Sequence, residues 1–183
     1  QKDQLQLLSF YDTLTPEQQE NLLAQIEGID WSLLDVLKTH ETVNARGTFA
    51  PLSAMELSQI DANRAHLEEV GLQAIREGKV AAVLLAGGQG TRLGFDKPKG
   101  MYNIGVTREL YIFECLINNV MEIVKKAGAW IPFYIMTSDK NYDDTTAFLK
   151  EKNYFGYNAK YIHFFKQEMA PSVDYNGKLL MEA

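Results

Sequence analysis

The chain has 183 residues, of which 46% are hydrophobic and 23% are charged, and its formal net charge is −6 at pH 7. This length suffices for one substantial hydrophobic core, or for one domain with an extension. The negative charge disfavours a nucleic-acid-binding surface, which needs clustered Lys and Arg. No apolar stretch reaches the ~18 residues of a membrane span, and the first residues do not resemble a signal peptide. We therefore expect a cytoplasmic protein with no membrane or nucleic-acid partner.

Residues 1–78 are predicted to form a helical N-terminal region. Thr15 can cap a helix that begins at Pro16, and Gln18 completes a capping box. This helix should end at Gly28, and Asp30 can cap a short helix after it. Residues 40–55 look irregular, whereas about 58–77 have the spacing of a helix that ends at Gly78. Its predicted packing face consists of Leu67, Val70, Ala74 and Ile75.

Residues 79–183 are predicted to form an α/β domain, because strand and helix patterns alternate there. The run 79–86 is apolar throughout after Lys79, which is typical of a strand buried on both faces of a parallel sheet. The further predicted elements are a helix over 107–127 that ends at Gly128, a strand over 131–137, a helix over 143–152 and a strand over 160–165. Cys115 lies among apolar helix residues, so we interpret it as a packing residue.

A glycine-rich loop follows the first predicted strand. Residues 84–100 read Leu-Leu-Ala-Gly-Gly-Gln-Gly-Thr-Arg-Leu-Gly-Phe-Asp-Lys-Pro-Lys-Gly. The carboxyl end of a strand is where open α/β sheets bind ligands. Three glycines without a Cβ allow positive φ angles and close approach to phosphate oxygens, and two cations supply charge; these residues are Gly87, Gly88, Gly90, Arg92 and Lys99. The pattern predicts a nucleoside triphosphate site, although three glycines alone are equally compatible with a tight turn.

Two better-known glycine motifs are excluded. A dinucleotide fingerprint would need a third glycine where the chain has Leu93, and no Gly-Lys pair is followed by Ser or Thr as a P-loop requires.

The complete run resembles the signature L-x-x-G-G-Q-G-T-R-L-G-x-x-x-P-K-G of UDP-N-acetylhexosamine pyrophosphorylases, and it matches without a gap. Related UDP-glucose pyrophosphorylases carry a divergent version of the loop. Similarity continues through residues 101–105, 135–138 and 164–167. The resemblance implies a Rossmann-like, GT-A-like nucleotidyltransferase fold, in which a mixed and mostly parallel sheet follows a helical N-terminal region.

The reaction implied by this resemblance joins UTP and N-acetylhexosamine 1-phosphate into a UDP-sugar and releases pyrophosphate. The expected catalytic residues are Arg92, for the β- and γ-phosphates, and Lys99, for the reacting phosphoryl oxygens. Gln167 resembles the glutamine with which the family recognises uracil, and Mg²⁺ is the implied cofactor. The complete set of expected nucleotide-binding residues is Leu85, Ala86, Gly87, Gly88, Gln89, Gly90, Thr91 and Gln167.

The chain begins with Gln1 and stops after Leu180-Met181-Glu182-Ala183 without a cap signal. We therefore expect a fragment that holds the nucleotide half of the domain, with the metal ligand and much of the sugar pocket beyond Ala183. Such a fragment should bind uridine nucleotides weakly and should not catalyse the transfer. Two alternatives stay open, a UDP-glucose or UDP-galactose pyrophosphorylase and a nucleotide-binding module without activity. The sequence does not indicate an oligomeric state.

Overall fold

The structure is a computed structural model that describes residues 3–32, 34 and 47–181. The chain forms two compact units, one of residues 1–51 with 170–183 and one of residues 52–169. Within the described residues, no helix is both long enough and apolar enough to cross a membrane.

The first unit contains helix α1, Pro16–Glu27, which confirms the helix predicted from its capping box. The Gln18 amide donates to Thr15 Oγ1 over 3.3 Å, and the Thr15 amide donates to Gln18 Oε1 over 2.9 Å. A small core joins Leu7, Leu34 and Leu179 in this unit. Most of the short helix predicted after Asp30 lies outside the described residues.

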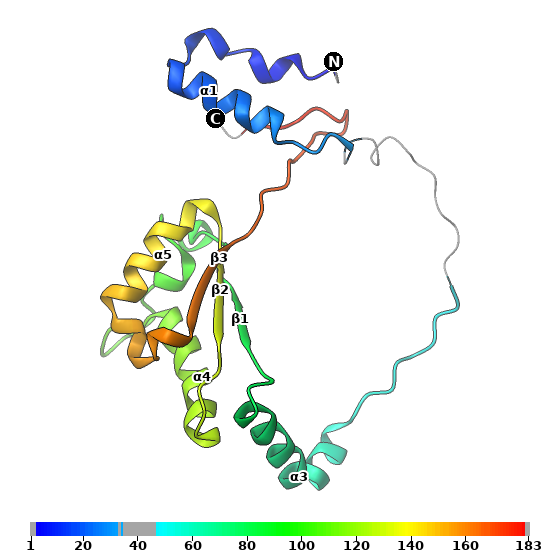
Figure 1. The fold of residues 1–183 in the computed structure, drawn as a ribbon, viewed down its shortest axis with the longest axis vertical. Coiled ribbons are helices and arrows are strands. Elements are labelled where there is room, and N and C mark those ends of the chain that lie inside the picture. Colours follow the sequence, from blue (N-terminus) through cyan, green and yellow to red (C-terminus); the bar gives the residue numbers. More distant parts are fainter. Residues whose placement is uncertain (1–2, 33, 35–46, 182–183) are drawn as a thin grey trace. The chain divides into compact units, whose positions relative to one another are not determined.

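The second unit contains a parallel sheet, which confirms the predicted α/β class. Its strands are β1, Ala82–Leu85; β2, Phe133–Thr137; and β3, Ile162–Lys166. The order in the described sheet is β1-β2-β3, so β2 pairs with both neighbours (Figure 1). The register places Leu84 opposite Ile135, and Ile135 opposite Phe164.

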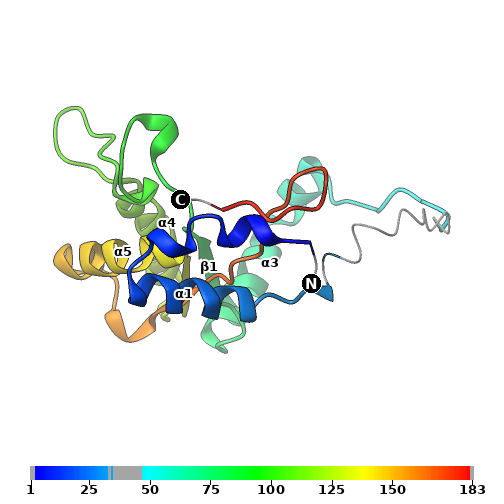
Figure 2. The same cartoon turned by 90° about the horizontal axis from the view of Figure 1, so that it is seen from above.

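Helices α4, Ile112–Ala127, and α5, Asp139–Glu151, lie on the same side of this sheet (Figures 1 and 2). Their apolar faces build the core with the sheet, and its most deeply buried large apolar side chains are Phe113, Ile117, Ile135 and Leu149. Helix α3, Leu57–Arg76, packs Leu72 and Ile75 against the same core. Gly78 and Gly128 follow α3 and α4 with φ angles of 70° and 68°, so both predicted helix stops are confirmed.

The first strand is not buried on both faces, contrary to the sequence prediction. Val83 and Leu85 are 60% and 71% exposed, whereas Ala82 and Leu84 face the core. On the same outer face, Tyr134 of β2 stacks on His163 of β3 at 4.9 Å between ring centroids. The reason is that α4 and α5 both cover the opposite face.

Three helix details also differ from the prediction. Helix α4 begins at Ile112 rather than near residue 107, because Asn103 Oδ1 accepts the amide N–H groups of Gly105 and Leu110 and holds the preceding segment as a loop. Helix α5 begins one turn early, at Asp139 rather than residue 143. In α3, the predicted face residues Leu67 and Val70 are exposed.

The compact units divide the chain differently from the predicted boundary at residue 78. Helix α3 belongs with the α/β unit because Ile75 is part of its core. Residues 170–183 belong with the first unit because Leu179 packs with Leu7 and Leu34.

Gly100 tests how tightly the α/β core is packed. A Cβ on Gly100 would lie 2.2 Å from Cζ of Phe113, a side chain that is 1% exposed. We expect Gly100→Ala to lower the free energy of unfolding by about 1–3 kcal/mol through overpacking, as measured by urea denaturation. Gly71→Ala is the matched control, because a Cβ there meets nothing within 4 Å and alanine favours the helix. Equal stability of Gly100→Ala and the parent chain would contradict this packing.

Candidate functional site

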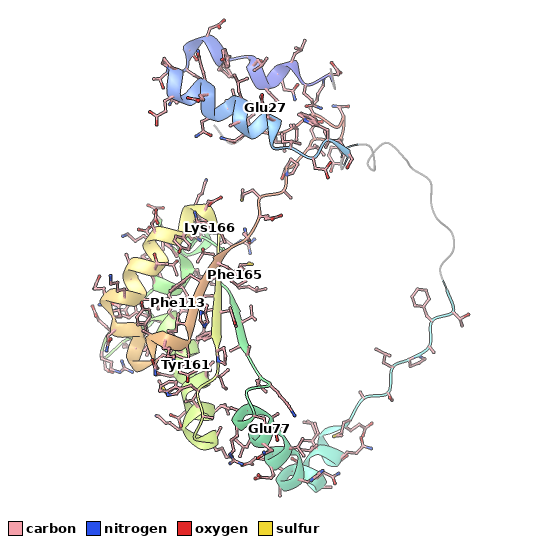
Figure 3. All side chains as sticks on the ribbon, in the orientation of Figure 1. Glu27, Glu77, Phe113, Tyr161, Phe165 and Lys166 are labelled. Atoms are coloured by element: carbon pink, nitrogen blue, oxygen red, sulfur yellow. The ribbon has the colours of Figure 1, made fainter. Side chains whose placement is uncertain are left out.

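The predicted site residues gather at one edge of the sheet. Because the three strands are parallel, their carboxyl ends meet at the same edge. The glycine-rich loop follows β1, helix α5 follows β2 and Gln167 follows β3. Figure 3 shows Phe165 and Lys166 at this end of β3, and Tyr161 at the other end.

The glycine-rich loop is closed by its own backbone. Gly90 donates its amide hydrogen to the carbonyl of Lys97 over 3.0 Å, and Lys99 donates to the carbonyl of Gly88 over 3.4 Å. Pro98 lies between these contacts and is almost completely buried. The loop is therefore an ordered structure with two paired arms and an exposed tip.

The glycines of this loop have different physical roles from those predicted. Gly87, Gly88 and Gly90 do not have positive φ angles; Gly94 does, with φ of 65° at the end of the short 3-10 helix Thr91–Leu93. A Cβ on Gly88 would meet nothing within 4 Å, so the space beside it is open. A Cβ on Gly90 would lie 2.8 Å from the Phe95 carbonyl oxygen, so this glycine is needed for the loop's own packing.

Gln167 lies directly against the glycine-rich loop, as a shared site requires. Its backbone N–H donates to the Thr137 carbonyl over 2.8 Å, which continues the pairing of β2 and β3. Its side-chain Oε1 lies 2.9 Å from the position that a Cβ on Gly87 would occupy. The missing side chain of Gly87 thus makes room for the amide of Gln167.

Asn141 is a site residue that the sequence interpretation missed. This side chain is 0% exposed, and its Nδ2 donates to the carbonyls of Gly87 over 3.0 Å and Gly88 over 3.1 Å. Its Oδ1 accepts a hydrogen bond from Nε2 of Gln89. A signal was available, since Asn141 has helical spacing with buried Thr145 and Phe148 and so lies on the inner face of α5.

Both predicted cations emerge from the glycine-rich loop. Arg92 is in the 3-10 helix at the tip, Lys99 begins a second 3-10 helix, and both are exposed. In the part of the chain that the structure describes, neither residue has an ion pair, and neither does the neighbouring Lys97. Their charges are therefore not neutralised by described protein groups.

The other expected nucleotide-binding residues, Leu85, Ala86 and Thr91, lie in different surroundings. Ala86 donates its amide hydrogen to the Met136 carbonyl over 2.8 Å, which fixes the start of the loop. The Leu85 side chain is on the outer face of the sheet, away from the helices, and Thr91 is exposed at the loop tip.

Among the described residues, the acidic side chains near this edge do not gather into a cluster of three or more metal ligands. The Asp139 carboxylate lies 2.8 Å from Nζ of Lys166, and this contact raises the pKa of the lysine above its ordinary value. Among residues 3–32, 34 and 47–181, no group of three or more His, Cys, Asp and Glu side chains could hold a metal ion.

Comparisons with known proteins identify relatives that match most of the chain. The family model described as UTP–glucose-1-phosphate uridylyltransferase matches residues 21–183. The chain is 32% identical to UDP-N-acetylglucosamine diphosphorylase 2 of Arabidopsis thaliana, and 34% identical to UDP-N-acetylglucosamine pyrophosphorylase of Saccharomyces cerevisiae. Each alignment covers 96% of this chain, but only 39% and 40% of the relatives, respectively.

A solved structure agrees with these sequence relatives. The chain is similar to uridine diphosphate N-acetylglucosamine pyrophosphorylase from Trypanosoma brucei in complex with an inhibitor, with a TM-score of 0.76 and 29% identity. The similarity covers 100% of this chain and 39% of that structure.

Proposed function

The chain belongs to the UTP–glucose-1-phosphate uridylyltransferase family, and on that premise we propose that it carries the nucleotide-binding part of a uridylyltransferase. The proposed reaction forms UDP-N-acetylglucosamine and pyrophosphate from UTP and N-acetylglucosamine 1-phosphate. Because the chain spans about 39% of the length of its curated relatives, the activity is proposed for the complete polypeptide.

The observation that carries this proposal is the contact region between Gln167 and Gly87. A glutamine amide offers one donor group and one acceptor, which matches the mixed hydrogen-bonding edge of uracil. It lies where the glycine-rich loop leaves the sheet, so a base held by Gln167 would have its phosphates near the loop. This arrangement supports a uridine nucleotide as the ligand.

The proposed chemistry needs no protein nucleophile. The attacking oxygen of the sugar phosphate is already anionic, so the protein has to align two polyanions and neutralise charge on the departing pyrophosphate. The planar guanidinium of Arg92 suits the β- and γ-phosphates, and the ammonium of Lys99 suits the reacting phosphoryl oxygens. Both are exposed without a described ion pair, which supports these roles. Mg²⁺ dependence and a cytoplasmic location stay predictions.

The choice of sugar is supported by the named relatives. The Arabidopsis and yeast proteins are named for UDP-N-acetylglucosamine, whereas the family model is described by glucose 1-phosphate. We propose the acetylated sugar, and the test is pyrophosphate release by the complete polypeptide with UTP and a panel of sugar 1-phosphates. A higher kcat/KM with glucose 1-phosphate than with N-acetylglucosamine 1-phosphate would favour the alternative.

Arg92 and Lys99 should contribute more to activity than the neighbouring Lys97. Replacing Arg92 or Lys99 by Ala in the complete polypeptide should lower kcat/KM about a hundredfold, which corresponds to the ~3 kcal/mol of a lost charge contact in the transition state. For Lys99→Ala the loss should be mainly in kcat. Lys97→Ala is the control, because this exposed lysine occupies a variable position of the signature and should keep near-parental activity. An equal effect of all three substitutions would indicate only a general charge effect.

Gln167 should determine which base binds. Removing its amide in Gln167→Leu should weaken UTP binding about tenfold, which is the expected scale of one or two lost hydrogen bonds. Binding of CTP should change much less, so the ratio of the two dissociation constants serves as an internal control. Calorimetric titration of this chain with each nucleotide gives both values. An unchanged preference for UTP would show that Gln167 does not contact the base.

Two glycine substitutions should separate ligand space from loop packing. Gly88→Val places its side chain in open space, so the chain should stay folded while UTP binding is lost by obstruction. Gly90→Val places a side chain against the Phe95 carbonyl, so it should also lower the urea midpoint. Undiminished UTP affinity of a folded Gly88→Val chain would mean that the loop is only a turn.

A further inference from the structure

We infer that Asn141 is a positioning residue that turns the amide N–H groups of Gly88 and Gln89 toward the bound nucleotide. This inference rests on the proposed function, because it assigns the direction of the loop amides relative to a ligand in that site. Neither the signature of the loop nor the match to the family includes a role for this side chain.

One buried amide group serves three successive loop residues. Asn141 Nδ2 donates one hydrogen bond to the carbonyl oxygen of Gly87 over 3.0 Å and one to that of Gly88 over 3.1 Å. Its Oδ1 accepts a hydrogen bond from Nε2 of Gln89. Because Asn141 is 0% exposed, water does not compete for these contacts. The side chain therefore fixes two consecutive peptide groups from the protein interior.

Fixing a carbonyl also fixes the amide of the next residue. The described part of the chain has no cis peptide bonds, and in a trans peptide the N–H points opposite to the C=O. The carbonyls of Gly87 and Gly88 belong to the peptide groups that carry the amides of Gly88 and Gln89. Since both carbonyls point to the buried Asn141, both amides point away from it.

These two amides are available to an anion or another acceptor. Within the described residues, the N–H groups of Gly88 and Gln89 have no hydrogen-bond partner, whereas Gly90 next to them donates to Lys97. Successive backbone N–H groups that point in one direction form a concavity that binds anions. The open space beside Gly88 lies at the same peptide groups.

Glycine makes an external anchor necessary. Gly87 and Gly88 have no side chains of their own to restrict the backbone, so their peptide groups can rotate more freely than those of other residues. The Lys99 amide donates to the Gly88 carbonyl from within the loop over 3.4 Å. Asn141 adds a restraint on both carbonyls from α5, whose inner face is fixed by buried Thr145, Phe148 and Leu149. The direction of the amides is thereby tied to the core.

The test replaces the donor without changing the shape of the side chain. Asn141→Asp puts a carboxylate, which only accepts hydrogen bonds, against two carbonyl oxygens. The peptide groups should turn so that the Gly88 and Gln89 amides face the new carboxylate. We expect these two amide protons to move downfield in ¹H–¹⁵N spectra of the ligand-free chain, and the dissociation constant for UTP to rise at least thirtyfold by calorimetry.

Thr145→Val is the matched control. Thr145 is also 0% exposed and lies one turn further along the same face of α5, but its Oγ1 has no hydrogen-bond partner among the residues that the structure describes. This nearly isosteric change should leave both the two amide signals and UTP affinity unchanged. If Asn141→Asp does not fold, Asn141→Ala decides, because it also removes both donors; a folded Asn141→Ala chain with parental UTP affinity would overturn the inference.

The two readouts separate this inference from the proposed function. If the parent chain binds UTP and a folded Asn141→Asp chain binds it equally well, the positioning role is wrong and the proposed function stands. If the parent chain does not bind UTP, the proposed function fails. In that case the Gly88 and Gln89 amide signals alone test the role of Asn141. Unchanged signals in Asn141→Asp would refute the inference that Asn141 sets the direction of these amides.

Discussion

Two backbone hydrogen bonds at the carboxyl end of β2 hold both halves of the candidate site. Met136 accepts the amide hydrogen of Ala86, the first residue after β1, and Thr137 accepts that of Gln167, the first residue after β3. Each bond extends a parallel strand pair by one step. Because the same strand supplies both acceptors, the glycine-rich loop and the glutamine are brought together although they are far apart in sequence.

The second support of the site comes from the core. Helix α5 is oriented by Phe148 and Leu149, which are buried between the helices and the sheet. Because Asn141 lies on the same face of α5 as Phe148, it also points inward, where its side chain contacts the glycine-rich loop. The precision of a loop that contains several glycines thus derives from apolar packing one or two helical turns away, since a close-packed interior leaves few alternative positions.

Local signals predicted the fold well because helix ends and strand patterns are encoded within a few residues. Helix stops at Gly28, Gly78 and Gly128, and the three strands of a parallel sheet, could all be derived in this way, whereas the order of the strands in the sheet was not predicted. The exposed outer face of β1 could not, because a continuous apolar run does not say which faces other elements cover. Asn141 was missed because the predicted helix began at residue 143, which left Asn141 in the segment before it, whereas α5 begins at Asp139 and carries Asn141 on its inner face.

The glycine-rich signature also shows why a sequence match assigns a family more directly than it assigns contacts. Some of its glycines leave space that a ligand can use, as Gly88 does, whereas Gly90 and Gly100 are required because Phe95 and Phe113 occupy the space where a Cβ would be. Both kinds look identical in the sequence. A signature of this type therefore records the folding of a loop together with its binding, and the physical surroundings of each glycine are needed to tell these two demands apart.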